Sequence, residues 1–430
     1  METMAEIFPF RGYRYSREEI ADLGDVVTQP YDKISEKMRK EYLERHRYNI
    51  VRVIKNSACE NAAENLNQWI KTGILQQDDS PSFYPYEQNF RFEGQSFSRL
   101  GFMGLVSLEA DPDSVKGHER VLDRPLEDRL NLIRSTEANE SPVFMLYSNP
   151  SMQADQLIRQ FSQDHDPLIE VTDQDGNTHR MWRLCDKDLH QQISEILSGS
   201  QLYIADGHHR FKTSELYYEE CQSRGWKVHG GESFDKRMVT LFNLNSPELK
   251  ILPTHRGIRS LKEFDLDQFL SGLKPHFIVE QMATVAELEA AMQGPGVRIG
   301  LAARKKTTYY LLHLRESSID DSTFMAEMTG TIRQLDVNVL HEGILRSTLG
   351  VDARQPSGQA QVSYFRHREE LIAQLEQGEC QLAFILNPTS LDEVRELSEQ
   401  GEKMPQKSTD FYPKLLTGLV LMKMEIDKGN

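Results

Sequence analysis

The segment QLYIADGHHRFKTSELYYEECQSRG, residues 201–225, constrains the fold of this chain more than any other. Its apolar run predicts a strand that leads without a spacer into Asp206, and a helical pattern begins around His209 or Arg210 and ends at Gly225. Such an abrupt change of direction suits Gly207, because glycine permits a tight turn. The segment therefore predicts a sheet edge at which a helix begins.

The remaining pattern predicts a mixed α/β fold, with α+β character, in two domains. Residues 36–47 and 60–75 read as helices, NIVRVIK (49–55) as a strand, and residues 82–110 as a hairpin that turns at EGQ. DG at 175–176 marks a second hairpin. Because the pattern changes near Leu261, we expect one domain over 1–260 and a C-terminal α+β module over 261–430.

Charge and composition exclude several classes of protein. The 430 residues include 66 acidic and 50 basic side chains, and the net charge of -16 disfavours general binding to nucleic acid. No run has the apolar length of a membrane span or a signal peptide, so we expect a cytoplasmic protein without membrane contact. The four cysteines form no CxxC pair, which argues against a structural zinc site and against a disulfide framework.

The DGHHR stretch has the composition of an anion site. Amide groups at a helix N-terminus attract negative charge, Arg210 offers a planar fork suited to phosphate, and His208 and His209 can both donate hydrogen bonds. Asp206 has three open roles: a ligand of a divalent metal such as magnesium, a base towards a hydroxyl, or a group that orients a histidine. The plain alternative is a strand-to-helix turn in which Asp206 is the helix cap.

Four other stretches have related chemistry. Each also has a plain interpretation as a surface turn or a solvated loop. If the loops converge at one sheet edge, they build a site rich in phosphate-binding side chains with two or three carboxylates. The stretches are GHER with Glu119, ILPTHRG with Thr254, His255 and Arg256, MPQKSTDFYP with Lys407, Ser408 and Thr409, and PYD with Asp32.

This set of side chains favours phosphoryl transfer over other chemistry. The sequence has no nucleophile elbow, no GxGxxG after a strand and no glycine-rich P-loop before Lys407, and its cysteines lie outside the five stretches. Phosphoryl transfer requires positioning, charge neutralisation, a metal ion and a base, and the five stretches contain those residue types.

The chain resembles a bacterial and archaeal family of unknown function that is marked by a DGHHR signature. The resemblance is co-linear over nearly the whole length, which makes it more specific than any single motif. It rests on IFPFRGYRY, PYDKIS, GHER followed by EDRLNLI, IADGHHR, ILPTHR, NPT and MPQKSTDFYPKLLTGL.

The DGHHR turn is also similar to the GxxR turn of the ParB and sulfiredoxin superfamily, which includes free-serine kinases. That resemblance implies a ParB/sulfiredoxin-like core with an insertion at about 60–200. It implies nucleotide phosphates held by Gly207, His208, His209 and Arg210, with Asp206 on a metal ion or the acceptor hydroxyl and Asp32 as a base. His208 stands where sulfiredoxin has a cysteine, so sulfinic-acid reduction is not expected, and the DNA-binding helices of ParB have no evident counterpart.

Together these observations predict a nucleotide-dependent phosphotransferase that acts on a small hydroxyl metabolite, with free serine as the first guess. Its expected cofactors are Mg²⁺ and ATP or ADP, its catalytic candidates are Asp206, Asp32, Glu119 and His209, and residues 404–418 are expected to return to the site. A nucleotide-binding regulator without turnover and a metal-dependent phosphoester hydrolase stay open as alternatives. The sequence does not indicate an oligomeric state.

Overall fold

The structure is a computed structural model that describes residues 6–429 apart from 57, 110–113, 122, 305–307, 320, 322–323 and 326–329. The chain forms two compact units: unit 1 comprises Met1–Gly117, Val121–Lys250 and Phe411–Asn430, and unit 2 comprises His118–Arg120 and Ile251–Asp410. The units are therefore not two consecutive stretches that divide near residue 260. The C-terminal segment belongs to unit 1 because β22 (Met422–Lys423) pairs with β7 (Ala138–Asn139) and β23 (Ile426–Asp427) with β12 (Lys227–Val228).

Unit 1 is built around a mixed sheet. Among its described residues nine strands pair, in the order β6-β11-β8-β13-β5-β4-β10-β9 with β1 beside β5. Strand β8 runs parallel to β13, whereas β11 runs antiparallel to β8. The strands are β1 (Ile7–Phe8), β4 (Tyr84–Phe92), β5 (Gln95–Ser107), β6 (Val115–Lys116), β8 (Val143–Tyr147), β9 (Ile169–Thr172), β10 (Thr178–Met181), β11 (Leu202–Asp206) and β13 (Lys236–Asn243).

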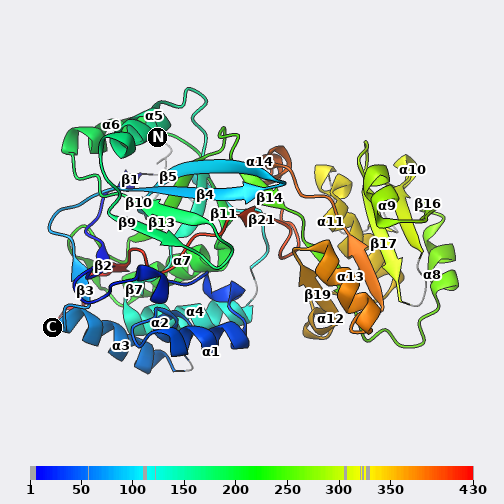
Figure 1. The fold of residues 1–430 in the computed structure, drawn as a ribbon, viewed down its shortest axis with the longest axis horizontal. Coiled ribbons are helices and arrows are strands. Elements are labelled where there is room, and N and C mark those ends of the chain that lie inside the picture. Colours follow the sequence, from blue (N-terminus) through cyan, green and yellow to red (C-terminus); the bar gives the residue numbers. More distant parts are fainter. Residues whose placement is uncertain are drawn as a thin grey trace. The chain divides into compact units, whose positions relative to one another are not determined.

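Helices lie on both sides of this sheet. In Figure 1 the helices α1 to α4 gather on one side, and α5 and α6 lie on the other. Apolar residues of α5 and α6, such as Ile158 and Ile193, pack into one buried cluster with Phe102 and Leu241 of the strands. The helices are α1 (Glu36–Arg45), α2 (Val51–Ile54), α3 (Cys59–Lys71), α4 (Asp123–Thr136), α5 (Gln153–Asp164), α6 (Lys187–Leu197) and α7 (His208–Ser223), and a short pair, β2 (Tyr13–Tyr15) and β3 (Leu75–Gln77), lies outside the main sheet.

The mixed α/β fold class and both predicted hairpins are confirmed. Strands β4 and β5 pair antiparallel around the turn at Glu93 and Gly94, both of which have positive φ. Strands β9 and β10 pair around Gly176.

The predicted strand over NIVRVIK is wrong, because Val51–Ile54 is a short helix. The side chain of Asn49 accepts a hydrogen bond from the backbone N–H of Val51 at 3.0 Å, which starts a helical turn. Val51, Val53 and Ile54 are all buried. Burial outweighs the strand preference of β-branched residues, which is a weak preference that depends on context.

Unit 2 has an antiparallel sheet of its own, as expected for an α+β module. Its six described strands pair in the order β16-β18-β17-β20-β15-β19. They are β15 (His255–Ile258), β16 (Phe277–Met282), β17 (Arg298–Ala303), β18 (Tyr309–Leu314), β19 (Val362–Phe365) and β20 (Leu382–Ile385). The helices are α8 (Leu266–Leu273), α9 (Val285–Met292), α10 (Glu316–Ile319), α11 (Asp336–Asn338), a π-helical stretch Val339–Thr348, α12 (Pro356–Gln361), α13 (Arg368–Gln377) and α14 (Leu391–Glu399).

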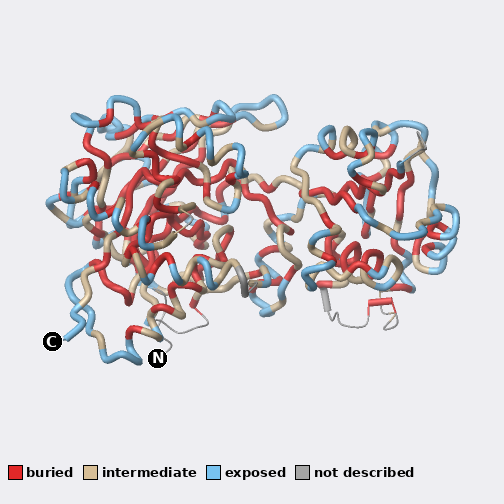
Figure 2. The backbone as a smooth tube through the Cα atoms, turned by 90° about the horizontal axis from the view of Figure 1, so that it is seen from below, coloured by how far each residue is buried: buried red, intermediate tan, exposed pale blue. Residues whose placement is uncertain are grey.

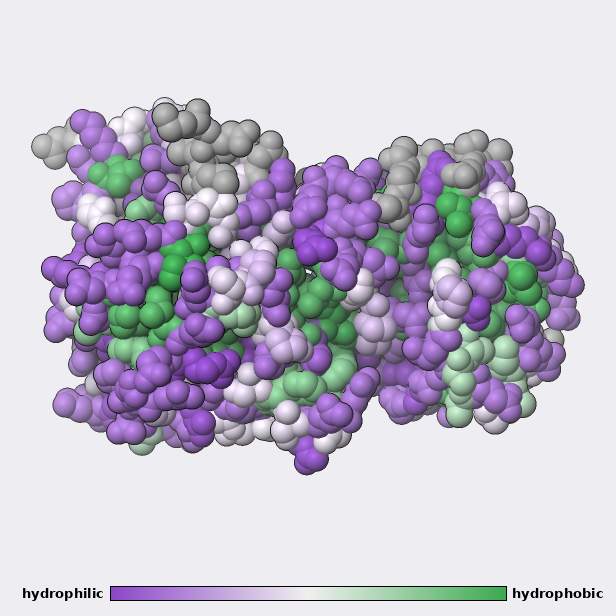
Figure 3. Space-filling view, turned by 90° about the horizontal axis from the view of Figure 1, so that it is seen from above, coloured by the Kyte–Doolittle hydropathy of each residue, from purple (hydrophilic) through white to green (hydrophobic). Residues whose placement is uncertain are grey.

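Each unit buries its own strands. Figure 2 shows buried backbone concentrated in the middle of each unit, with exposed loops around it. The face drawn in Figure 3 is largely hydrophilic and carries scattered apolar residues. None of the helices that the structure describes combines the length and the apolar character needed to cross a membrane.

Candidate functional site

The DGHHR stretch forms the predicted turn between a strand and a helix. Strand β11 ends at Asp206, Gly207 adopts a left-handed conformation with φ of 100°, and α7 begins at His208. Gly207 is the residue that caps α7, and no side chain at the cap position covers the helix N-terminus. This excludes the plain alternative in which Asp206 is the helix cap. The first amide groups of α7 thus mark a place where an anion is stabilised.

Asp206 is surrounded by cations. Its Oδ1 accepts a hydrogen bond from Lys414 Nζ at 3.2 Å, and its Oδ2 accepts one from Arg210 Nη2 at 3.0 Å. Burial alone would raise the pKa of this carboxyl, but the charges of Lys414, Arg210 and Lys33 outweigh burial and hold the pKa well below its usual range. Asp206 is therefore ionised at neutral pH.

Arg210 is fixed by two further constraints. It is 7% exposed, and its Nη1 donates a hydrogen bond to the backbone carbonyl of Pro142. A Cβ atom at Gly207 would lie 2.9 Å from Arg210 Nη2, so the glycine makes room for the guanidinium as well as for the turn. His208 is buried against Gly117, where an added Cβ would approach its ring to 3.0 Å, whereas His209 is only half-buried.

The PYD stretch lies beside this turn. A short helix over Tyr31–Lys33 places the Tyr31 ring under the Arg129 guanidinium, with 4.1 Å between the guanidinium carbon and the ring centre. Burial and the charge of Asp32 raise the pKa of Tyr31 to about 12, while the charges of Arg129 and Arg210 oppose that rise. Because Lys33 acts on Asp206 and Arg210 acts on Tyr31, the two stretches share one electrostatic centre. Asp32 is exposed at its edge.

Lys414 is the residue of this centre that sequence reasoning missed. The sequence pattern singles out MPQKSTDFYP for Lys407, and it predicts that residues 404–418 return to the site without naming Lys414. Buried side chains of the sheet hold the backbone here: Arg99 donates to the carbonyls of Tyr412 and Pro413 at 3.0 and 2.8 Å, and Gln88 Nε2 donates to the carbonyl of Lys414 at 2.9 Å. No local pattern distinguishes the two lysines, because these partners are remote in sequence.

Residues of the other three stretches come together within unit 2, whereas Gly117, the first residue of GHER, belongs to unit 1. Met404 pairs with the GHER segment: its N–H donates to the carbonyl of His118 at 2.7 Å, and Glu119 and Met404 form a parallel bridge. The His118 ring is fully buried, and its Nε2 lies 3.0 Å from Thr409 Oγ1. Ser408 Oγ donates to the carbonyl of Pro405 at 2.6 Å.

Arg256 joins these segments. It is 1% exposed, and its guanidinium donates to the carbonyl of Thr254 and, over 3.0 Å, to the carbonyl of Lys407. Its guanidinium carbon lies 5.3 Å from the centre of the Tyr364 ring. Burial lowers the pKa of Arg256 to about 10, and burial followed by the charge of Arg256 lowers the pKa of His255 to about 4. Arg256 thus braces the fold here through backbone carbonyls.

The thirteen predicted site residues accordingly fall into two sets. Asp32 and Asp206–Arg210 belong to unit 1, whereas Glu119, Thr254–Arg256 and Lys407–Thr409 belong to unit 2. Buried hydrogen bonds to backbone dominate the second set, which is the pattern of a structural support. In the first set the partly exposed carboxylate of Asp206 contacts Arg210 and Lys414, and we therefore take this set as the candidate functional site.

The same centre does not fit a resident magnesium ion. Both oxygens of Asp206 already contact cations. Among the described residues, no group of three or more histidine, cysteine or acidic side chains is placed to hold a metal ion. The arrangement suits the oxygens of a phosphate better than a divalent cation.

The fold and this centre together define a mixed α/β protein with a candidate anion site at a strand-to-helix turn. A family model described as protein of unknown function (DUF1015) matches residues 7–338, so the chain belongs to that family. This confirms the resemblance to a family of unknown function, while the more remote likeness to a ParB/sulfiredoxin core stays a prediction. No curated protein matches the sequence.

Three solved structures illustrate the likeness of fold. A mutant free serine kinase in complex with AMP has 15% sequence identity, covers 72% of this chain and 87% of its own, and gives a TM-score of 0.38. A conserved hypothetical protein from Pyrococcus furiosus has 16% identity, with 72% and 91% covered and a TM-score of 0.36. SbnI from Staphylococcus aureus, truncated at its C-terminus, has 12% identity, with 73% and 85% covered and a TM-score of 0.36.

Proposed function

We propose that the centre around Asp206 binds the phosphates of a nucleotide and that the protein transfers a phosphoryl group to a small hydroxyl metabolite. The observation that supports this most is the concentration of Lys33, Arg210 and Lys414 around one carboxylate at the N-terminus of α7. A chain with a net charge of -16 repels anions in general. A local cationic centre on such a chain selects one small anion and holds it in a fixed place.

A phosphate group would bind here by replacing the Asp206 carboxylate as a hydrogen-bond acceptor. Its carboxylate contacts Lys414 and Arg210 in the way that phosphate oxygens do, with charge-assisted hydrogen bonds. A nucleotide phosphate at the start of α7 would replace Asp206 as the partner of Lys414. Arg210 would stay in position, because it donates a hydrogen bond to the Pro142 carbonyl. These side chains would then neutralise charge on the transferring group, which is the main requirement of phosphoryl transfer.

Asp32 is the proposed base. It is exposed and lies next to Tyr31, at the edge of the cationic centre. In the proposed step the acceptor oxygen bonds to the terminal phosphorus of ATP, the bond from that phosphorus to the bridging oxygen breaks, ADP leaves with the electron pair, and Asp32 receives the hydroxyl proton. L-Serine is the first acceptor to test, because the DGHHR turn resembles the turn of a superfamily that includes free-serine kinases.

The test is a phosphorus NMR screen with ATP or ADP, magnesium as the ordinary counter-ion, and a pool of hydroxyl metabolites that includes L-serine. We expect a new phosphomonoester with the wild-type chain and with the matched control Asp166→Asn, which removes an exposed charge elsewhere in unit 1. Lys414→Met and Asp32→Asn should each lower the rate by about 10²-fold or more, in line with the loss of a charge-stabilising or proton-accepting group.

The outcomes separate the alternatives. Binding of AMP by calorimetry without any product would support the nucleotide-binding regulator. Release of phosphate without an acceptor would support a hydrolase. If neither nucleotide nor phosphate binds, the proposal is wrong.

A further inference from the structure

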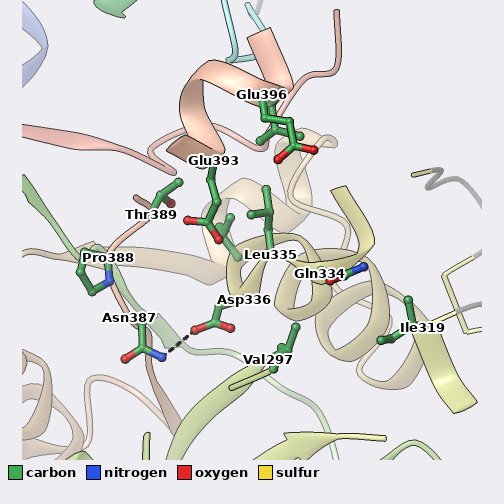
Figure 4. Close-up of a pocket in the computed structure, with 13 residues that line it drawn as sticks. Val297, Ile319, Gln334, Leu335, Asp336, Asn387, Pro388, Thr389, Glu393 and Glu396 are labelled. Atoms are coloured by element: carbon green, nitrogen blue, oxygen red, sulfur yellow. Dashed lines mark hydrogen bonds between the residues drawn. The ribbon is translucent and has the colours of Figure 1, made fainter. Parts of the chain in front are cut away.

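Unit 2 contains a cavity of about 380 Å³ that the proposed function does not use. It lies between the start of β17, the start of α11, the helix α14 and the loop that follows β20 (Figure 4). Its volume is in the range of small-molecule sites. One wall is formed by Asn387, Pro388 and Thr389, the NPT stretch of the sequence.

The charge in this cavity has one sign. Asp336, Glu393 and Glu396 line it, and Figure 4 shows Glu393 extending from α14 towards Asp336. The lining residues that the structure describes include no lysine, arginine or histidine. An anion such as a nucleotide phosphate would be repelled here, so this cavity and the centre around Asp206 suit ligands of opposite charge.

Asp336 is held in a fixed orientation by two hydrogen bonds from neutral donors of the described part of the chain. Its Oδ2 accepts a hydrogen bond from Asn387 Nδ2 at 2.9 Å, and its Oδ1 accepts one from the backbone N–H of Arg298 at 3.2 Å. Burial raises the pKa of this carboxyl to about 6, and the charge of Glu393 adds to that rise. A carboxylate that is desolvated and lacks a cationic partner gains from any ammonium group that enters the cavity.

The rest of the wall favours an organic cation over a metal ion. Val297, Leu335 and Leu397 give the cavity an apolar surface that suits a hydrocarbon chain. The three carboxylates do not form a group that could hold a metal ion, a finding that covers the described residues. Negative charges that are spread along a partly apolar wall match two ammonium groups joined by methylene groups.

We propose that this cavity binds a small aliphatic diamine or polyamine, with one ammonium group on Asp336 and a second towards Glu396. The proposal adds a second ligand site to the protein and is independent of the phosphoryl-transfer function.

The test is isothermal titration calorimetry of the full chain with 1,4-diaminobutane in 150 mM salt at pH 8, where Asp336 is ionised. We expect one saturable site per chain, and no binding of 1,4-butanediol, which has the same chain length without charge. Asp336→Asn and Glu396→Gln should each weaken binding by about tenfold or more, as expected for a lost charge-assisted hydrogen bond. Glu396 is exposed, so its variant should fold normally even if Asp336→Asn does not.

Glu376→Gln is the matched control, because Glu376 is an exposed glutamate of unit 2 outside the cavity. The affinity of the Glu376→Gln variant for 1,4-diaminobutane should stay within about twofold of the wild-type value. Heats that never saturate, an equal loss in Glu376→Gln, or an affinity that Glu396→Gln leaves unchanged would each overturn the proposal. AMP titrations of the same variants should be unaltered, so failure at this cavity and failure at the Asp206 centre are distinguished.

Discussion

Replacing Lys414 by methionine tests the centre around Asp206 most directly. The Lys414 side chain is 7% exposed, and its Nζ lies 3.2 Å from Asp206 Oδ1. Removing one partner of a buried ion pair costs about 3–5 kcal/mol when the other charge is left alone. Here Arg210 stays 3.0 Å from the second oxygen. We therefore expect Lys414→Met to lower the free energy of unfolding by about 1–3 kcal/mol at pH 7.

The assay is urea unfolding of four chains: wild type, Lys414→Met, Asp206→Asn and the double variant. The coupling energy between the two positions should be about 1–2 kcal/mol, because the residues are in direct contact. Asp206 has a lowered pKa in the folded state, so the stability it contributes is present above its unfolded pKa of about 3.9 and is lost as the pH falls below that value.

Lys414→Met raises that folded pKa, so the difference between the variant and wild type should narrow as the pH falls from about 5 towards 2. A variant within about 0.5 kcal/mol of wild type at pH 7, or a difference that does not respond to pH, would refute the reasoning.

Three further predictions concern other parts of the structure. Burial and Arg256 lower the pKa of His255 to about 4 in the folded chain, so as the pH falls this histidine binds a proton in the unfolded chain before it does so in the folded chain. The free energy of unfolding should therefore fall by about 1–3 kcal/mol between pH 6.5 and 4 in wild type but not in His255→Asn, as measured by urea titration at each pH. The pKa of Asp336 is raised to about 6, so its contribution to stability is present below about pH 4 and lost as the pH rises through 6, and Asp336→Asn should remove about 1–3 kcal/mol of that pH dependence. Gly207→Ala should lower the free energy of unfolding by about 1–2 kcal/mol and weaken AMP binding, because φ of 100° strains alanine and its Cβ would lie 2.9 Å from Arg210. A thermal unfolding midpoint equal to that of wild type would contradict this prediction.

Local patterns in the sequence predicted the elements that carry the site. The strand over 202–206 and the helix after Gly207 follow from an apolar run, a glycine and a helical period, all of which lie within one short stretch. The hairpins at Gly94 and Gly176 were likewise predicted from residues that lie within one short stretch each. The helix Val51–Ile54 was not predicted, because the burial of its valines depends on the packed structure.

The grouping of the site residues required the three-dimensional structure. Five stretches of similar composition supported the prediction of one convergent set of loops. The structure separates most of them into two sets, because Arg256 and His118 contact buried backbone and hydroxyl partners, whereas Arg210 and Lys414, which are also buried, contact the partly exposed carboxylate of Asp206. Composition cannot show which arginine contacts a carboxylate as well as a backbone carbonyl, as Arg210 does, and which contacts backbone carbonyls and a histidine ring, as Arg256 does.

The path of the chain through the two units has a consequence for biosynthesis. The chain leaves unit 1 after Lys250 and returns to it at Phe411, and Lys414 follows Asp206 by 208 residues. At about 5–20 residues per second, a ribosome delivers Lys414 roughly 10–40 s after Asp206. The growing protein therefore carries Asp206 and Arg210 without their lysine until unit 2 has been made. A chain released early keeps most of its sheet but has only Arg210 and Lys33, and not Lys414, acting on Asp206.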